Sequence, residues 1–186
     1  MTIAGFYSDP HFGHRRIIEF ARRPFRDLDE MQSVFIDRYN AKIGAGDTVI
    51  WCGDAFFMEI AEAKKILSAM NGSKLLVRGN HDGTKPKMAS IGFDIVVDEL
   101  ELRIGGRHAL VSHYPYDNSK RLHSGPEDPY EDRYPVRVKG RALIHGHDHS
   151  PSKGHSLSAH VGVDAWDYGP AMWGEVEAVL RGGKLT

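Results

Sequence analysis

Cysteine is almost absent from this 186-residue chain, which holds only Cys52. A single cysteine cannot form an internal disulfide bond, and it cannot build a structural thiolate zinc site. The chain also lacks an excess of charge of either sign, since 24 Lys and Arg stand against 25 Asp and Glu for a formal net charge of −1. This balance gives the whole chain no bulk electrostatic attraction to nucleic acid or to an acidic membrane surface.

Long apolar runs are missing as well. No stretch approaches the roughly 20 consecutive apolar residues that a membrane-spanning helix needs. The N-terminal run from Met1 to Tyr7 carries no basic segment, so we expect neither a signal peptide nor a transit peptide. Together with the lone cysteine, these absences predict a cytoplasmic protein with no membrane partner.

The sequence does contain a series of short polar clusters, each of which follows a run of apolar residues. The clusters are Asp9-Pro10-His11, Gly53-Asp54, Gly79-Asn80-His81-Asp82, His113 and His145-Gly146-His147-Asp148-His149. A short apolar run that stops at a turn signal is typical of a buried strand. Because several strand ends of one sheet can converge on a point, we expect these clusters to form one site.

Apolar patterning in the first half of the chain alternates between strands and helices. We expect strands over residues 2–8, 48–52 and 74–77, and helices over residues 15–21, 28–43 and 60–70. Asp27 is the predicted N-cap of the second helix, and Glu30 would complete a capping box. Alternation of this kind is typical of α/β architecture.

The second half of the chain predicts antiparallel pairing. Residues 100–104 and 108–112 flank a Gly105-Gly106 turn, which indicates a hairpin and therefore mixed sheets. We also expect strands over residues 142–144 and 157–163 and a short helix over residues 171–180. With no internal repeat and no linker, the chain is expected to form a single domain over residues 1–186.

Residues 114–140 form a long polar segment whose charged side chains balance, five basic against five acidic. The segment also carries rings that could stack a nucleobase, namely Tyr114, Tyr116, His123, Tyr130 and Tyr134. Two interpretations stay open. The segment is either a loop on the substrate side, in which His123 would contact a nucleotide, or a surface loop with no role in substrate binding.

The ligand-type residues of the clusters suit divalent metals. Asp, Asn and His without Cys are ligands for Mn, Fe, Zn, Ni or Mg. The candidates are Asp9, His11, Asp54, Asn80, His113, His147 and His149. This set is too large for one tetrahedral ion but fits two ions that share a carboxylate. Asp54 is the natural shared ligand, because it follows a glycine that lets the backbone turn sharply.

The ordered clusters resemble the signature of the calcineurin-like metallophosphoesterase superfamily. The matching motifs are Asp9-x-His11, Gly53-Asp54, Gly79-Asn80-His81-Asp82, His113 and Gly146-His147-x-His149. They span residues 9 to 149, and every ligand-type position is filled. The run from Ser8 to His14 is similar to a compact subset of the superfamily that is largely bacterial and phage-borne.

The resemblance implies a fold and a ligand set. The fold would be two mixed β-sheets packed as a sandwich and flanked by helices. One metal ion would be held by Asp9, His11, Asp54 and His149, and a second by Asp54, Asn80, His113 and His147. Mn is the metal expected first, with Fe, Zn, Ni or Mg as alternatives.

The resemblance also implies a mechanism. Two ions about 3.5–4 Å apart would clamp a phosphoryl group, and a hydroxide bridging them would attack phosphorus in line. His81, which is not a ligand, would protonate the leaving oxygen. Asp82 would orient the imidazole of His81.

Other polar side chains near the clusters have supporting roles or open alternatives. His145 is expected to support the ligands without binding metal. His14 is a candidate substrate contact, with a packing role as the alternative. Arg15 and Arg16 are candidate phosphate contacts. A solvated helix face is the default interpretation of the whole basic run, which comprises Arg15, Arg16, Arg22, Arg23 and Arg26.

These observations predict a hydrolase, specifically a metal-dependent phosphodiesterase. Its expected substrates are small nucleotide-type phosphodiesters, with 2′,3′-cyclic nucleotides among the candidates. A phosphomonoesterase and a single-strand nuclease remain enzymatic alternatives. A non-enzymatic protein-binding scaffold would predict eroded ligand positions, which this chain does not have. The expected partner is a small phosphoester, and the sequence carries no strong signal for nucleic-acid binding.

Overall fold

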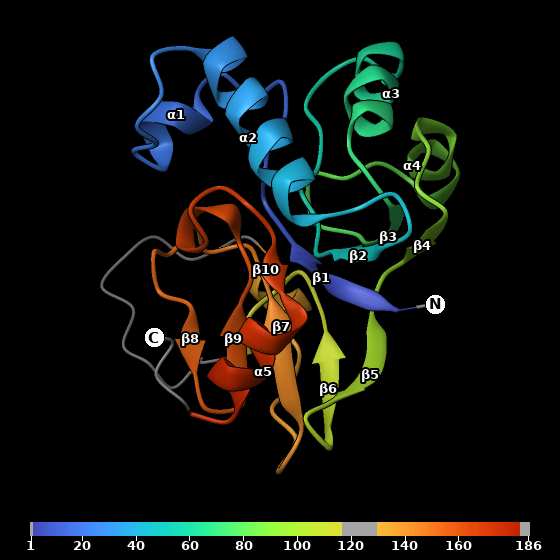
Figure 1. Ribbon diagram of the computed structural model, residues 1–186. Coiled ribbons are helices and arrows are strands. Elements are labelled where there is room, and N and C mark those ends of the chain that lie inside the picture. The colour runs from blue at the N-terminus through green and yellow to red at the C-terminus, as the bar shows by residue number, and fades with distance from the viewer. Residues whose placement is uncertain (1, 117–129, 183–186) are drawn as a thin grey trace.

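The computed structural model describes residues 2–116 and 130–182. Its first sheet has the strand order β10-β1-β2-β3-β4 (Figure 1). The strands are β1 (Ile3–Tyr7), β2 (Thr48–Trp51), β3 (Ser73–Val77), β4 (Ile95–Val97) and β10 (Ala171–Met172). Strands β1 to β4 run parallel and β10 pairs with β1 in the antiparallel sense, so the sheet is mixed.

The second sheet has the strand order β5-β6-β7-β9-β8. Its strands are β5 (Leu100–Ile104), β6 (Arg107–Val111), β7 (Ala142–His145), β8 (Gly154–His155) and β9 (Ser158–His160). The β5–β6 and β8–β9 pairs are antiparallel, whereas β6, β7 and β9 are parallel. The predicted hairpin and the predicted mixture of strand directions are both confirmed.

Apolar side chains cover both faces of the first sheet. On its outer face, Tyr7 and Trp51 pack against a layer of helices that includes α2 (Leu28–Lys42), with Phe35 and Tyr39 as α2's buried aromatics. The same helical side holds α1 (Ile17–Phe20), α3 (Ile60–Ala69) and α4 (Lys85–Ile91) (Figure 1). The inner face meets the second sheet, as in the sandwich that the sequence predicted.

The core between the two sheets is built from alternate strand residues. Phe6 and Ile50 of the first sheet join Val111 and Ile144 of the second in one buried cluster. Helix α5 (Trp173–Leu180) adds its buried face to this cluster, with Val176 among the contributors. Side chains of a strand alternate between faces, so the neighbours of these residues point away from this core.

Helix α2 begins where the sequence places its cap. Asp27 accepts a hydrogen bond from the Glu30 backbone N–H at 2.9 Å, which satisfies one of the unpaired donors of the first turn. The reciprocal half of the expected capping box is displaced by one residue. The Glu30 carboxylate accepts from the Arg26 N–H at 2.7 Å, so it caps the residue before the N-cap.

The structure differs from the sequence-based expectation at the shortest elements. Residues 171–180 divide into the edge strand β10 and helix α5, and the strand expected over residues 157–163 is limited to β9. Strands β4 and β8 were not predicted, because two or three residues are too few to show a periodic pattern. No helix in residues 2–116 and 130–182 has the length and apolar character that crossing a bilayer requires.

Both sheets direct their polar clusters to the same end of the sandwich. The carboxyl ends of β1, β2 and β3 share one edge because the three strands are parallel. A parallel bridge between Ser8 and Gly162 links the loop after β1 to the loop after β9. In the second sheet, the Gly146 N–H donates to the His113 carbonyl at 3.0 Å. The loops that carry the candidate ligands therefore meet.

Candidate metal centre

The loops after β1 and β2 are held together by their backbones. The Asp9 N–H donates to the Gly53 carbonyl at 3.1 Å, and the His11 N–H donates to the Asp54 carbonyl at 3.1 Å. Five candidate ligands occupy the left-handed backbone region, with φ values of 58° for Asp9, 51° for His11, 54° for Asp54, 78° for His147 and 48° for His149. Strained conformations of this kind cluster at functional sites.

Two glycines allow the carboxylates to approach the backbone closely. A Cβ at Gly79 would collide with Asp54 Oδ1, and a Cβ at Gly146 would collide with Ser8 Oγ and Asp9 Oδ2. These close approaches explain why the clusters are marked by glycine.

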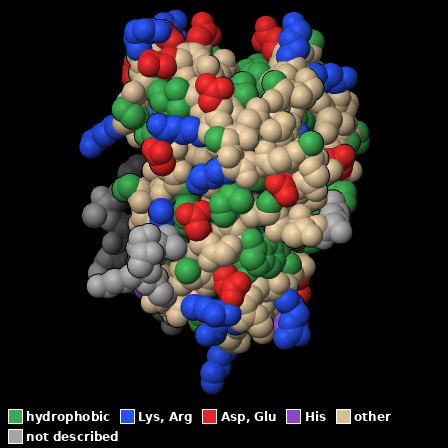
Figure 2. Space-filling view, viewed as in Figure 1, with side chains coloured by type: hydrophobic (Ala, Val, Ile, Leu, Met, Phe, Trp, Pro, Cys, Tyr) green, Lys and Arg blue, Asp and Glu red, His purple; other side chains and the backbone are tan. Residues whose placement is uncertain are grey.

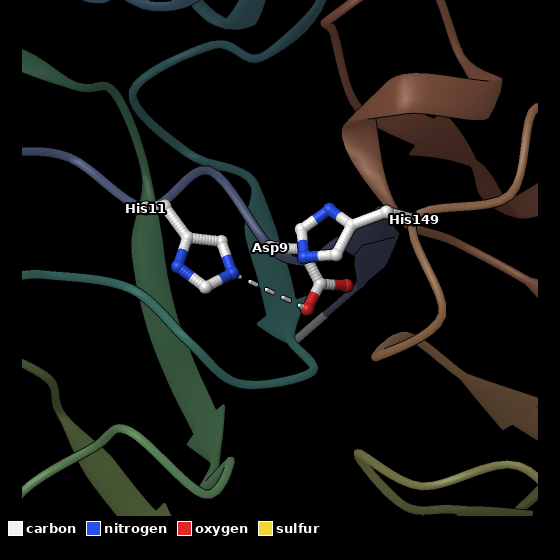
Figure 3. A group of neighbouring side chains, drawn as sticks. All are labelled: Asp9, His11 and His149. Atoms are coloured by element: carbon white, nitrogen blue, oxygen red, sulfur yellow. Dashed lines mark ion pairs between the residues drawn. The ribbon is translucent and has the colours of Figure 1, made fainter. Parts of the chain in front are cut away.

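One group of potential ligands comprises Asp9, His11 and His149, whose ligand atoms all lie within 4.8 Å of one another. In Figure 3 the His11 imidazole lies to the left of the Asp9 carboxylate, and the His149 imidazole lies beside the same carboxylate. The centroids of the two rings are 4.9 Å apart. His11 Nε2 lies 4.0 Å from Asp9 Oδ1, too far for a hydrogen bond. All three side chains could reach an ion between them.

The chemistry of this group fits a cation. Asp9 Oδ1 and both ring nitrogens of His11 are buried and have no hydrogen-bond partner among the described residues. A buried polar atom without a partner is costly, and a bound cation would satisfy these atoms. Burial lowers the pKa of His11 to about 2 and keeps the imidazole neutral, as a metal ligand must be.

A second group lies on the other side of Asp54. His113 Nε2 is 3.5 Å from Asp54 Oδ2 and 2.9 Å from Asn80 Oδ1. His147 Nδ1 lies 3.2 Å from the same His113 nitrogen. Asp54 Oδ2 is also 3.6 Å from His11 Nε2, so this oxygen lies between the two groups. Asp9, Asp54 and His113 likewise have ligand atoms within 4.8 Å of one another.

The pKa values of the two buried carboxylates, Asp54 and Asp9, are shifted in opposite directions. Burial, together with the nearby charges of Asp9 and Asp82, raises the pKa of Asp54 to about 8. Burial also acts to raise the pKa of Asp9, but His113, His149 and His11 outweigh it and hold that pKa well below its usual range. A divalent cation between the carboxylates would favour the ionised form of both.

Two candidate histidine ligands are oriented by hydrogen bonds on their far sides. His113 Nδ1 donates to the Cys52 carbonyl oxygen at 2.7 Å, and its Nε2 faces Asp54 and Asn80. His149 Nδ1 lies 2.9 Å from Asp164 Oδ2. Such outer contacts fix the tautomer and orientation of a metal-binding imidazole.

Asp164 and Arg23 form a buried pair that the sequence did not reveal as part of the site. Arg23 donates to both oxygens of Asp164, through Nε at 2.8 Å and Nη2 at 3.0 Å. It also donates to the Asp9 carbonyl at 2.7 Å and the Pro10 carbonyl at 3.0 Å. The guanidinium therefore connects the loop of Asp9 to the carboxylate that orients His149.

The expectation that Arg23 lies on a solvated helix face is therefore wrong, because this side chain is only 4% exposed. No local signal separated Arg23 from the four arginines around it. Asp164 lies in the 3-10 helix Val163–Ala165, far along the chain from its partner. Their pairing becomes visible only when both sheets are assembled.

Asp82 holds the loop after β3 through its backbone contacts. Its Oδ2 accepts from the N–H groups of Asp54 at 2.9 Å and Gly79 at 2.8 Å, and its Oδ1 accepts from the N–H of Ala55 at 3.0 Å. Both carboxylate oxygens are thus engaged by backbone amides. Through these contacts Asp82 organises the loop that carries His81.

His81 lies beside the candidate ligands and remains exposed to solvent. Its backbone N–H donates to Asp54 Oδ1 at 3.0 Å, and its ring packs 4.8 Å from the Phe57 ring. The centroids of the His81 and His11 rings are 5.8 Å apart. Burial, followed by the neighbouring His113, lowers the pKa of His81. The imidazole is close to the site without occupying a ligand position.

The residues predicted to contact the substrate have varied surroundings. The His14 ring stacks on Phe57 at 4.5 Å, on the side where His81 also packs. Arg15 and Arg16 are exposed, and the Arg16 guanidinium lies over the Phe20 ring at 4.7 Å. His123 lies outside the described residues.

His145 is buried beside the site. Its Nδ1 is 3.0 Å from the Gly146 carbonyl, and its ring lies 5.5 Å from that of His160. It belongs to neither group of potential ligands found among the described residues. The supporting role of His145 stays a prediction.

The sequence of the chain matches one known protein family and two curated proteins. The model of the calcineurin-like phosphoesterase superfamily domain matches residues 2–163. The Gene 66 protein of Mycobacterium phage L5 is 31% identical over 195 residues, which cover 89% of this chain and 88% of the phage protein. An uncharacterized protein of Methanocaldococcus jannaschii is 26% identical over 191 residues, covering 96% of this chain and 92% of that protein.

A solved structure extends the comparison to the fold. The crystal structure of a protein of unknown function from Aquifex aeolicus is 25% identical to this chain, with a TM-score of 0.71 over 95% of this chain and 98% of the other. The family match covers most of the sequence and includes every candidate ligand from Asp9 to His149. With its cluster of potential metal ligands, the chain therefore belongs to the calcineurin-like phosphoesterase superfamily, a family of metal-dependent phosphoester hydrolases.

Proposed function

We propose that the protein is a dinuclear-metal-dependent phosphodiesterase that hydrolyses small nucleotide-type phosphodiesters, including 2′,3′-cyclic nucleotides. The observation that carries the proposal is the position of Asp54 Oδ2, 3.6 Å from His11 Nε2 and 3.5 Å from His113 Nε2. A carboxylate oxygen between two histidine-containing groups is suited to being shared by two ions.

We assign the candidate ligands to two ions, with Mn expected first. The first ion would be held by Asp9, His11, Asp54 and His149, and the second by Asp54, Asn80, His113 and His147. When bound, the two ions would lower the pKa of a water nucleophile and neutralise charge on the phosphoryl oxygens. The chain contributes their spacing, because Gly79 and Gly146 let the carboxylates approach the backbone.

His81 is the group that we propose delivers a proton to the leaving oxygen. Its backbone is tied to Asp54 and its ring is exposed beside Phe57, which gives the imidazole access to a leaving group at the rim. Asp82 acts on His81 indirectly, because it fixes the loop that carries both Asn80 and His81. General acids of this type contribute about 10²–10⁴-fold to rate.

The charge pattern supports a small substrate over a long polyanion. Lys and Arg side chains are interspersed with Asp and Glu on the face seen in Figure 2, and neither sign gathers there into a broad patch. The net charge of −1 agrees with this mixture. Binding of a long nucleic acid relies on many phosphate contacts with basic side chains. We also propose a cytoplasmic location, since Cys52 is a buried free thiol.

Metal content and turnover test the proposal together. Protein loaded with Mn should bind close to two ions per chain and cleave bis(4-nitrophenyl) phosphate. Asp54→Asn should lower turnover by about 10²-fold or more, because the shared ligand loses its charge. Asp37→Asn is the matched control on the exposed side of α2, where the same change should leave turnover intact. Two bound metals without turnover of this diester, across Mn, Fe, Zn, Ni and Mg, would contradict a phosphodiesterase role.

A substrate panel separates the alternatives. It compares phosphomonoesters, linear diesters, 2′,3′-cyclic and 3′,5′-cyclic nucleotides and single-stranded DNA. Preference for the nucleotide diesters supports the proposal. Turnover of monoesters alone would identify a phosphomonoesterase, and cleavage of single strands a nuclease. A protein that binds no metal would instead fit a scaffold.

A further inference from the structure

A cavity of about 370 Å³ adjoins the metal centre on the side of Asn80. Its walls come from the loop after β3, the turn between β4 and β5, the residues after β6 and the 3-10 helix Glu131–Arg133. Asn80 lines the cavity and also lies 2.9 Å from His113 through its Oδ1 atom. A group attached to a phosphoryl bound at the centre could therefore extend into the cavity. Its volume is within the roughly 300–1,000 Å³ range of small-molecule sites.

Tyr114 and Arg133 line one wall of the cavity, where they contribute an aromatic ring and a positive charge. The Arg133 Nη1 donates to the Tyr114 hydroxyl at 3.3 Å, and the Arg133 guanidinium lies over the Tyr130 ring at 5.4 Å. A guanidinium has five N–H donors, so a single contact with a neutral hydroxyl leaves donors for a ligand. Such donors suit the carbonyl oxygens of a nucleobase.

The aromatic wall continues around the candidate ligand His147. The ring centroids of Tyr114, Tyr130 and Tyr134 lie 5.2, 6.3 and 5.8 Å from that of His147. Tyr114 and Tyr134 are themselves 5.7 Å apart. Aromatic side chains in this position favour a planar group next to the phosphoryl, because nucleobases stack on aromatic rings whatever their sequence.

Two carboxylates before β5 also line the cavity: Glu99, which is exposed, and Asp98, which is neutralised by basic side chains. Asp98 forms ion pairs with Arg78 and with Lys85, the latter at 2.6 Å. Among the described side chains, no carboxylate forms an ion pair with Arg133. Arg133 is thus the cation of this wall that is available to a bound molecule.

The proposed acid lies outside the lining of the cavity. The His81 ring packs on Phe57 at 4.8 Å, toward His14. Its far neighbour is Tyr130, with ring centroids 6.4 Å apart. In hydrolysis, water adds to phosphorus, the bond to the leaving oxygen breaks, and that oxygen takes a proton. If His81 supplies this proton, the leaving group departs on the Phe57 side. The cavity is then left for the ester group that stays on phosphorus.

We propose that this cavity holds the nucleoside that remains on phosphorus, and that Arg133 and Tyr114 are specificity-determining side chains. The inference rests on the proposed phosphodiesterase activity. For linear diesters it adds a direction to that activity, because the nucleoside is retained on phosphorus and the group beside His81 is released.

Two substrates with the same leaving group test this inference. The 4-nitrophenyl ester of thymidine 5′-monophosphate and methyl 4-nitrophenyl phosphate both release 4-nitrophenolate, but they retain a nucleoside or a methyl group. The wild-type protein, loaded with Mn, should prefer the nucleoside ester by about tenfold or more in kcat/KM. Arg133→Ala should reduce this ratio by about tenfold, with the loss in KM. Tyr114→Phe keeps the ring but removes the hydroxyl anchor, so it should produce a smaller loss in the same ratio.

The matched control is Arg107→Ala, an exposed arginine on the β5–β6 hairpin that does not line the cavity. This variant should keep the wild-type ratio. A wild-type ratio near one, or a ratio that Arg133→Ala does not change, would overturn the inference. Failure to cleave either ester with metal bound would instead overturn the proposed function, so the two failures are distinguishable.

Discussion

At the scale of single residues, the centre depends on side chains whose backbones are held in unfavourable conformations. Asp9, His11 and Asp54 all have positive φ, and such conformations cost about 1–3 kcal/mol each. The cost is offset by surrounding contacts, such as the Asp9 N–H bond to the Gly53 carbonyl. The backbone and its hydrogen bonds therefore set the positions of these side chains.

The proposed acid His81 gives a prediction that depends on the leaving group. In His81→Ala, hydrolysis of an alkyl diester should slow by about 10²–10⁴-fold, because an alkoxide leaves poorly without a proton. Hydrolysis of a 4-nitrophenyl ester should slow far less, since its leaving group is stable as an anion. The measurement is kcat for both esters with metal content held equal. His155→Ala, at an exposed histidine, is the control. Equal losses on both esters would show that His81 is not the acid.

Asp164 gives a second prediction at this scale. Asp164→Asn keeps the shape of the side chain but removes the charge that orients His149 and pairs with Arg23. Metal affinity should fall by about 10–100-fold, the usual effect of losing an outer partner of a ligand. Calorimetric titration of metal measures it. Asp167→Asn is the control, because Asp167 forms an exposed ion pair with Arg38 far from the ligands. Unchanged affinity in Asp164→Asn would contradict the orienting role.

At the scale of elements, the loop after β3 is stabilised by one carboxylate. Asp82 accepts three backbone N–H bonds that tie this loop to the loop after β2. Loops that carry function are usually held by a rigid scaffold. Here the scaffold includes a side chain from within the loop itself.

Removal of that carboxylate should destabilise the protein. In Asp82→Ala three backbone donors lose their acceptor, so we expect the free energy of unfolding to fall by about 2–4 kcal/mol. Urea denaturation of the metal-free protein gives this value without interference from ligand binding. Glu101→Ala removes an exposed ion pair with Arg141 and should cost about 1 kcal/mol or less. A loss in Asp82→Ala no greater than in this control would contradict the organising role.

At the scale of the whole molecule, the raised pKa of Asp54 predicts a pH dependence of stability. Its pKa in the folded protein is about 8, against 3.8 as the reference value for the unfolded chain. Because the folded metal-free protein binds this proton more tightly, its contribution to stability is fully present below about pH 4 and is lost as pH rises to about 8. Bound metal competes with the proton, so stabilisation by metal should increase over the same range.

Thermal denaturation with and without Mn measures both effects. The increase in Tm caused by Mn should be larger at pH 8.5 than at pH 6, and chelation should reverse it. In Asp54→Asn the group no longer titrates, so the dependence of the metal-free protein on pH should flatten between these values. A metal effect that shrinks as pH rises would contradict the assigned role of Asp54.

Much of the fold could be predicted from the sequence because apolar residues recur with a clear periodicity along the longer helices and strands. Helix α2 and the β5–β6 hairpin are of this kind, and both formed where expected. The seven candidate ligands could be picked out because each follows a strand, and parallel strands bring their ends together. Asp164 and Arg23 could not be found in this way. They are 141 residues apart, and their contact depends on how the two sheets pack.

The contacts between the two sheets have a consequence for metal exchange. Asp9, His11, Asp54 and Asn80 come from the first sheet, whereas His113, His147 and His149 come from loops of the second. The Ser8–Gly162 bridge and the Arg23–Asp164 pair join these halves at the ligand end. In the proposed ligand assignment, an ion held from both sides would act as a cross-link between the two sheets, and we expect its release to be coupled to their separation there. The lifetime of the bound ion should therefore report on the opening of the sandwich, and hydrogen exchange along β1 and β7 should slow together once metal is added.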